Sequence, residues 1–147
     1  MVPFRGTFDH TLDAKNRLTM PSRFRDALKD GVVLATPIDQ KPCVSVWRPE
    51  PYQHYTSAAL EGVSPLSSRK SELERFFYGY SHETELDAAG RVMIPSMFAE
   101  PTGLSKEVVV VGVGDHLELW DRNRWSEHRP ALLSGVAEVT ARVDQAG

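Results

Sequence analysis

The strongest constraint on the fold is an internal repeat. Residues 12–21 read LDAKNRLTMP, and residues 86–95 read LDAAGRVMIP. A second match, VSVWRPEPY at 44–52 with LELWDRNRW at 117–125, follows in the same order. A repeat determines the architecture before any local pattern does, so the chain is predicted to contain two copies of one structural unit.

Each copy is predicted to begin with a strand, a turn and a returning strand. Residues 8–13 alternate apolar and polar side chains, as a half-buried strand does. The turn contains Asn16 in the first copy and Gly90 in the second, two residue types that readily adopt a positive φ. The returning strand ends at Pro21 or Pro95, because proline cannot donate to a strand ladder and suits the first turn of a helix.

Helices and further strands complete the prediction. Residues 22–30 should form a short amphipathic helix with Phe24, Ala27 and Leu28 on one face. A second strand pair follows in each copy, at 32–35 with 43–47 and at 108–111 with 116–120. Apolar residues at helical spacing lie between the copies, and we interpret the aromatic stripe Leu66, Leu73, Phe76, Phe77 and Tyr80 as core packing. Pro130 is expected to break a last helix, and the tail TARVDQAG is expected to fray.

One such unit, about forty residues long, is too small to fold alone comfortably. Two units can close their open sheets on each other about a pseudo-twofold axis, each supplying half of one core. The expected domain organisation is a first repeat at 7–52, a helical insert at 53–80, a second repeat at 81–124, and a C-terminal helix and tail at 125–147.

The repeated pattern Asp-x-x-Gly-Arg-aliphatic-x-aliphatic-Pro resembles the AbrB-like (SpoVT/AbrB) swapped-hairpin motif. Asp87, Gly90 and Arg91 carry it in the second copy, and Asn16 replaces the usual glycine in the first. Two copies in one chain of 147 residues, with FRGTFDHTLDAKNRLTMPSRFR at the start and VVVVGVGDHLELWDRNRW near the end, resemble the MraZ family over about residues 4–129. Two extra residues at the N-terminus and Pro130 in the last helix depart from the family pattern.

This resemblance implies an α+β fold, a double-split β-barrel built from two AbrB-like swapped-hairpin repeats with flanking helices. It also implies a ring-like homo-oligomer and a transcriptional regulator. Such regulators bind short direct repeats in double-stranded DNA upstream of the division and cell-wall gene cluster, and they commonly repress their own operon.

The distribution of charge favours the first copy as the DNA-contacting one. The chain has a net charge of −3, yet residues 5–29 contain six basic and three acidic residues. Where the first copy has Lys15, Arg23 and Arg25, the second has Ala89, Met97 and Ala99. A basic patch on an acidic chain can attract a polyanion, although a solvated basic face remains the alternative.

Candidate DNA-contacting residues follow from this comparison. Lysine and arginine neutralise phosphates, and an arginine at a hairpin tip can reach guanine O6 and N7 in the major groove. For Arg17 we favour DNA contact, whereas for Arg91 we favour an ion pair with the aspartate four residues before it. The predicted DNA-binding residues are Arg5, Lys15, Asn16, Arg17, Arg23 and Arg25, and the predicted turn-forming residues are Asp13, Asp87, Gly90 and Arg91.

Other functional classes find little support in the sequence. Cys43 lies in a predicted strand without a His–Asp arrangement, so we interpret it as a buried structural thiol rather than an enzyme's nucleophile. The histidines lack metal-ligand spacing, and no cofactor motif is recognised, since GVG at 112–114 is not followed by GK[ST]. An antitoxin-like or purely assembling module remains the third class.

The expected location is the cytoplasm, at the nucleoid. A single cysteine fits a reducing compartment, and we identify neither a secretion signal nor an apolar run long enough to cross a membrane.

Overall fold

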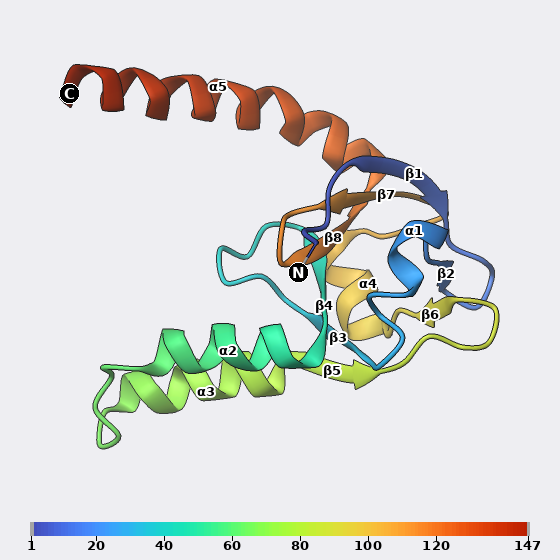
Figure 1. Ribbon diagram of the computed structural model, residues 1–147, viewed down its shortest axis with the longest axis horizontal. Coiled ribbons are helices and arrows are strands. Elements are labelled where there is room, and N and C mark those ends of the chain that lie inside the picture. The colour runs from blue at the N-terminus through green and yellow to red at the C-terminus, as the bar shows by residue number, and fades with distance from the viewer. Residues whose placement is uncertain (1, 147) are drawn as a thin grey trace.

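The computed structural model describes residues 2–146, with the side chains of 2–143. Figure 1 shows a mixed α+β body from which two helical features project, the α2–α3 pair and the long helix α5. The elements are β1 (Thr7–Thr11), β2 (Arg17–Thr19), α1 (Ser22–Arg25), β3 (Val32–Ala35), β4 (Cys43–Trp47), α2 (Pro49–Leu60), α3 (Ser68–Gly79), β5 (Ser81–Thr84), β6 (Arg91–Met93), α4 (Ser96–Thr102), β7 (Glu107–Gly112), β8 (His116–Asp121) and α5 (Arg122–Ala146).

Within the described residues, the strands form two antiparallel sheets, and both mix the two copies. The larger sheet has the order β1-β7-β8-β4-β3-β5, and the smaller one pairs β2 with β6. The equivalent strands of the two copies are β1 and β5, β2 and β6, β3 and β7, and β4 and β8. Exchanging each strand for its equivalent gives the same strand orders, read from the opposite edge. The registers agree, because Ser45 lies opposite its equivalent Glu118 and Leu18 lies opposite Val92. The expected pseudo-twofold arrangement is therefore present.

The predicted strand–turn–strand segments pair across the copies. β1 lies beside β7 of the second copy, and β5 lies beside β3 of the first. The two arms of the first hairpin meet only in an isolated bridge between Leu12 and Leu18. The returning strands pair with each other because this places Leu18 and Val92 in the shared core, where both are buried. The six-stranded and two-stranded sheets are separate ladders in residues 2–146 and do not form one closed barrel.

The main core contains matched residues from both copies. Met20 and Ile94 are buried together with Phe24 and Phe98. Each copy thus contributes its half of one hydrophobic core, as the small size of one unit required.

The helices differ from the predictions in three places. Helix α1 ends at Arg25 instead of continuing to residue 30, and turns follow, so Phe24 and Leu28 are buried but Ala27 is exposed. The core-packing interpretation is confirmed for Phe77, whose carbonyl accepts a hydrogen bond from the buried Tyr52 hydroxyl at 2.9 Å. It is wrong for Leu66 and Tyr80, which are 96% and 53% exposed because they lie at the outer loop and at the helix end.

Pro130 does not break the last helix. Helix α5 continues from Arg122 to Ala146 with Pro130 inside it, so the prediction of a broken helix and a frayed tail was wrong for these residues (Figure 1). Proline removes one N–H donor, but a helix can continue past that single lost bond. Within residues 2–146, no helix combines the length and apolar character needed to cross a membrane.

Candidate nucleic-acid interface

The first turn is built around the carboxylate of Asp13. One oxygen, Oδ1, accepts the backbone N–H groups of Lys15 at 2.8 Å and Arg17 at 2.9 Å. The other, Oδ2, accepts Arg17 Nε at 2.7 Å. Asn16 takes a φ of 57°, which closes the turn through its N–H to the Asp13 carbonyl at 3.0 Å. The aspartate therefore holds both the backbone of the turn and the Arg17 side chain.

The second turn repeats this geometry. Asp87 Oδ1 accepts the N–H groups of Ala89 and Arg91, both at 2.9 Å, and Oδ2 accepts Arg91 Nε at 2.8 Å. In both turns the backbone N–H of the arginine, followed by its side chain, holds the pKa of the aspartate below its usual range. The predicted Asp–Arg ion pair is thus present in the two copies alike.

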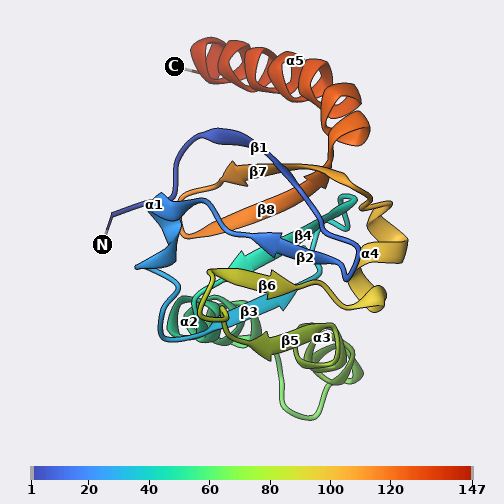
Figure 2. The same ribbon diagram turned by 90° about the vertical axis from the view of Figure 1, so that its right-hand side faces the viewer.

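The two turns lie at opposite ends of the β2–β6 ladder (Figure 2). The carbonyl of Asn16 accepts the N–H of Ile94 at 2.8 Å, and the carbonyl of Gly90 accepts the N–H of Met20 at 2.9 Å. Each turn is therefore hydrogen-bonded to the strand of the other copy. The two tips form one unit, not two independent hairpins.

The ladder presents one outward face. Leu18 and Val92 are buried, and the residues on either side of each point the other way. Their register places Arg17 beside Met93 and Thr19 beside Arg91. We call this face the ribbon face, consisting of Arg17, Thr19, Arg91 and Met93. Sequence reasoning missed Thr19 and Met93, although their alternation with buried residues was a readable signal.

Arg25 lies at the second turn, away from Arg17. Its Nε donates to the Met20 carbonyl at 2.9 Å, and its side chain covers Gly90. A Cβ at Gly90 would lie 2.6 Å from Arg25 Nε. The predicted cationic group around the first turn is consequently divided, because the exchange of strands carries α1 to the turn of the other copy.

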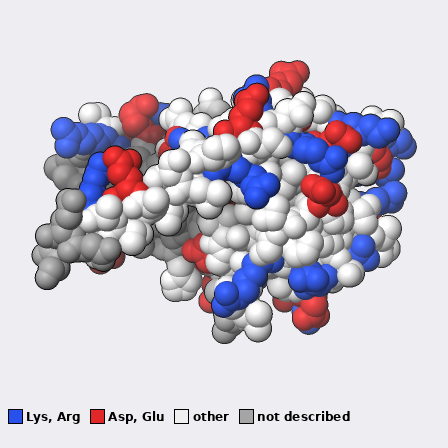
Figure 3. Space-filling view, turned by 90° about the horizontal axis from the view of Figure 1, so that it is seen from above, with Lys and Arg blue, Asp and Glu red and all other residues white. Residues whose placement is uncertain are grey.

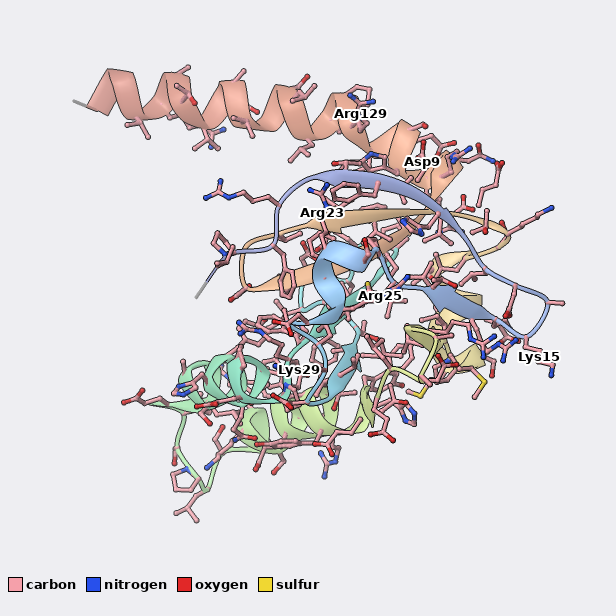
Figure 4. All side chains as sticks on the ribbon, turned by 45° about the vertical axis from the view of Figure 1, so that its right-hand side comes forward. Asp9, Lys15, Arg23, Arg25, Lys29 and Arg129 are labelled. Atoms are coloured by element: carbon pink, nitrogen blue, oxygen red, sulfur yellow. The ribbon has the colours of Figure 1, made fainter. Side chains whose placement is uncertain are left out.

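The remaining predicted residues occupy two locations. Lys15 lies at the tip of the first turn, whereas Arg23 lies on α1 (Figure 4). The Arg23 guanidinium lies 4.6 Å from the centre of the Phe8 ring. Arg5 and Arg23 line one shallow cavity together with Phe24. Arg5 and Arg23 thus form a second basic location, separate from Lys15, Asn16 and Arg17.

The face seen in Figure 3 has no uniform basic field. Seen from above, basic and acidic side chains are interspersed, with several basic ones toward the end of the body that is on the right in Figure 1 (Figure 3). Any contact to a polyanion therefore depends on individual side chains and their placement.

Cys43 is buried, as predicted, at 1% exposure. Burial, followed by the nearby Glu118 carboxylate, raises the pKa of its thiol. A thiol held in its neutral form is a poor nucleophile. Among the described residues, no group of three or more His, Cys, Asp or Glu side chains is arranged to hold a metal ion.

Comparison with known proteins identifies the family. A family model described as "MraZ protein, putative antitoxin-like" matches residues 3–71 and again residues 77–142, which is the repeat found in the sequence. "Transcriptional regulator MraZ" of Thiobacillus denitrificans is 37% identical over 139 residues, covering 92% of this chain and 93% of that protein. The proteins of the same name from Halorhodospira halophila and Mycoplasmoides gallisepticum are 36% and 33% identical, each over at least 93% of both chains. The resemblance inferred from the repeated motif is confirmed, and the chain belongs to the MraZ family.

Proposed function

We propose that this chain is a sequence-specific, DNA-binding transcriptional regulator whose ribbon face contacts double-stranded DNA. The observation that carries the proposal is the ribbon face itself, with an aspartate-held arginine at each end. A two-stranded β-ribbon has the width to enter the major groove. The relatives' name, transcriptional regulator, supports the same function.

The proposed contacts divide into two kinds. Arg17, positioned by Asp13, reads base edges, because a guanidinium can donate two hydrogen bonds to guanine O6 and N7. Lys15, Asn16, Arg5 and Arg23 contact the phosphate backbone and set the position of the ribbon. Arg25 adds positive charge beside the second turn, although its Nε is already bonded to Met20.

The family resemblance supports a more specific role. We propose that the targets are short direct repeats upstream of the division and cell-wall gene cluster, including the chain's own operon, and that the outcome is repression. A cytoplasmic, nucleoid-associated protein without catalytic turnover fits that role.

We further propose self-association into a ring-like homo-oligomer. A single ribbon offers few contacts, and several linked sites bind evenly spaced repeats far more tightly than one does. Helix α5 supports this assembly, since its exposed apolar residues include Leu132, Val136, Val139 and Val143.

Within each subunit, we propose that the two sheets are the halves of a double-split barrel. The repeats at 7–52 and 81–124 flank the insert 53–80, and the C-terminal helix and tail at 125–147 follow.

The two turns provide matched variants for a test. Arg17→Ala and Arg91→Ala remove the same side chain from the same geometry, and we expect Arg17→Ala to weaken binding more, because Lys15 and not Ala89 lies beside it. Loss of a base contact costs about 1–3 kcal/mol per site, which multiplies across the sites of an oligomer. The measurement is a mobility-shift titration on the chain's own promoter fragment, with melting curves recorded in parallel.

Lys15→Ala is the phosphate-contact variant. It should lower affinity similarly on all sequences and flatten the salt dependence. Binding that survives Arg17→Ala but not Arg91→Ala, with both variants folded, would place the interface at the second turn.

Two alternatives have distinct outcomes in the same experiments. A purely assembling or antitoxin-like module would show no salt-dependent retention of the promoter fragment. Light scattering that finds only single chains at micromolar concentration would exclude the ring.

A further inference from the structure

A large cavity lies beside helix α4 of the second copy, away from the ribbon face. Its volume is about 710 Å³, within the range of small-molecule sites. It lies where the end of α3, helix α4, the loop 36–42 and the start of α5 meet. Figure 2 shows α3 and α4 at the same end of the molecule.

The corresponding place in the first copy is partly covered, and only a smaller cavity of about 280 Å³ remains there, lined in part by Arg23, Phe24 and Ala27. Met97, Phe98 and Pro101 of the cavity wall are the repeat equivalents of Arg23, Phe24 and Ala27. In the first copy the rings of Phe4 and Phe8 cover Phe24, with centroids 5.4 and 5.6 Å away. The N-terminal segment that carries Phe4 is fixed by backbone hydrogen bonds between Phe4 and Gly114.

The second copy has no such cover because its chain arrives differently. The backbone bond from Gly112 to the Gly6 carbonyl has its equivalent in the bond from Thr36 to the Tyr80 carbonyl. The segment that precedes Tyr80 in the second copy, however, is helix α3, which ends at Gly79. In addition, the exposed His82 replaces Phe8. The space above Phe98 therefore stays open.

The lining of this cavity is apolar with a basic rim. Phe76, Phe98, Met97 and Pro101 supply apolar wall, and Phe76 and Tyr80 stack with centroids 6.2 Å apart. Lys41 and Arg124 are the charged residues of the lining, which contains no aspartate or glutamate. In the part of the chain with described side chains, neither cation forms a salt bridge.

Arg124 is also held in place. Its Nε lies 2.8 Å from where a Cβ of Gly103 would stand, so the guanidinium packs directly on the turn after α4. The lining thus carries a local positive charge on a chain whose net charge is −3. It selects for a negatively charged group at the mouth of an apolar space.

From these observations we propose that the cavity is a binding site for a small amphipathic anion. The ligand has a planar or aliphatic body, which packs against Phe76, Met97 and Phe98, and a carboxylate, sulfonate or phosphate group, which pairs with Lys41 and Arg124. This site is separate from the ribbon face and from the apolar residues of α5.

The test uses 8-anilinonaphthalene-1-sulfonate, a planar body with one sulfonate, as the probe on the full chain. Fluorescence titration should show saturable binding of one probe per chain. Lys41→Glu with Arg124→Glu should weaken it about 10-fold or more, since both cations become repulsive. Met97→Trp, which fills the space from an exposed position, should abolish it.

Matched controls separate this site from other surfaces. Lys29→Glu with Arg129→Glu makes the same change of charge outside the cavity, and Val139→Trp introduces a tryptophan on α5, so both should leave binding unchanged. The uncharged analogue N-phenyl-1-naphthylamine should bind the parent chain more weakly than the sulfonate does. Absence of saturable binding, or equal binding by the cavity variants and the controls, would overturn the proposal.

Discussion

At the scale of single residues, Arg25 shows how two nearly identical copies become different. Its side chain covers the turn of the other copy, and its Nε lies 2.6 Å from where a Cβ of Gly90 would stand. The equivalent of Arg25 in the second copy is Ala99, and the equivalent of Gly90 is Asn16, which keeps a φ of 57°. Asparagine is thus compatible with the backbone of the turn, and it is the Arg25 side chain that would have to shift to admit a Cβ at position 90.

This pairing predicts a coupled pair of substitutions. Gly90→Asn should destabilise the fold by about 1 kcal/mol or more, because its Cβ would displace Arg25 from the turn. In an Arg25→Ala background the same substitution should cost clearly less, since the second turn then matches the first. Denaturant unfolding of the four proteins measures the coupling, and additive effects would contradict the contact.

His116 is a second residue whose surroundings make a prediction. Its ring stacks on Trp47 with centroids 4.3 Å apart, and its Nδ1 lies 2.7 Å from Asp115 Oδ1. Burial of the ring lowers the pKa of His116, but the carboxylates of Glu118 and Asp115 outweigh that effect and raise it. Asp39 and Tyr55 line a cavity together with His116.

Because the folded-state pKa is raised, the stabilisation by protonated His116 is complete below the ordinary histidine value, about 6.5, and is lost as the pH rises through the raised pKa. Melting temperature should therefore fall across that interval. His116→Gln should flatten this part of the profile. A variant with the same slope as the parent would assign the pH dependence to another group.

At the scale of elements, local patterns located most helices and strands, but only some of their ends. The repeated motif and its prolines indicated where β2 and β6 stop and where α1 and α4 begin. Pro130 misled the reading of α5, since a proline signals a helix end in the sequence even where the helix continues past it. The early end of α1 could not be predicted from the sequence either, because the conformation after Arg25 depends on how Leu28 packs in the core.

Pro130 therefore lies inside α5 at a position where another residue would stabilise the helix. Pro130→Ala restores one backbone donor, and alanine is favoured over proline in a helix interior by about 3 kcal/mol. The residues after position 130 are largely exposed, so this gain should appear as slower amide exchange of residues 131–140 and not as a large shift of the melting temperature. Unchanged exchange would mean that the proline does not limit the stability of the helix.

At the scale of the whole molecule, the sequence revealed the two copies and their shared core, but not the partners of the strands. Periodicity predicts a half-buried strand at residues 8–13, and it holds no information on which neighbour completes the ladder. The same limit applies to the interface, where the basic residues of the first copy are close in sequence but Arg25 lies at the second turn. The pairing of strands across the two copies determines where these basic residues lie, and this pairing is visible only in the three-dimensional structure.

This interleaving predicts how a half-chain behaves. In a fragment of residues 1–62, β1 lacks β7, β2 lacks β6 and β4 lacks β8, so the fragment retains only the β3–β4 ladder and half of the core. Such a monomer buries too little apolar surface to fold, and it should show no sharp thermal transition.

Two copies of the fragment can, however, supply each other with the missing partners about the twofold axis. Any folded fragment should therefore be a dimer whose melting temperature rises with concentration, and adding residues 63–147 should replace one copy in a more stable complex. The test combines sedimentation with melting curves over a concentration range of about 100-fold. Over this range, mass action changes the apparent free energy of unfolding of a dimer by about RT ln 100. A folded monomeric fragment with a concentration-independent transition would show that one copy is complete without the other.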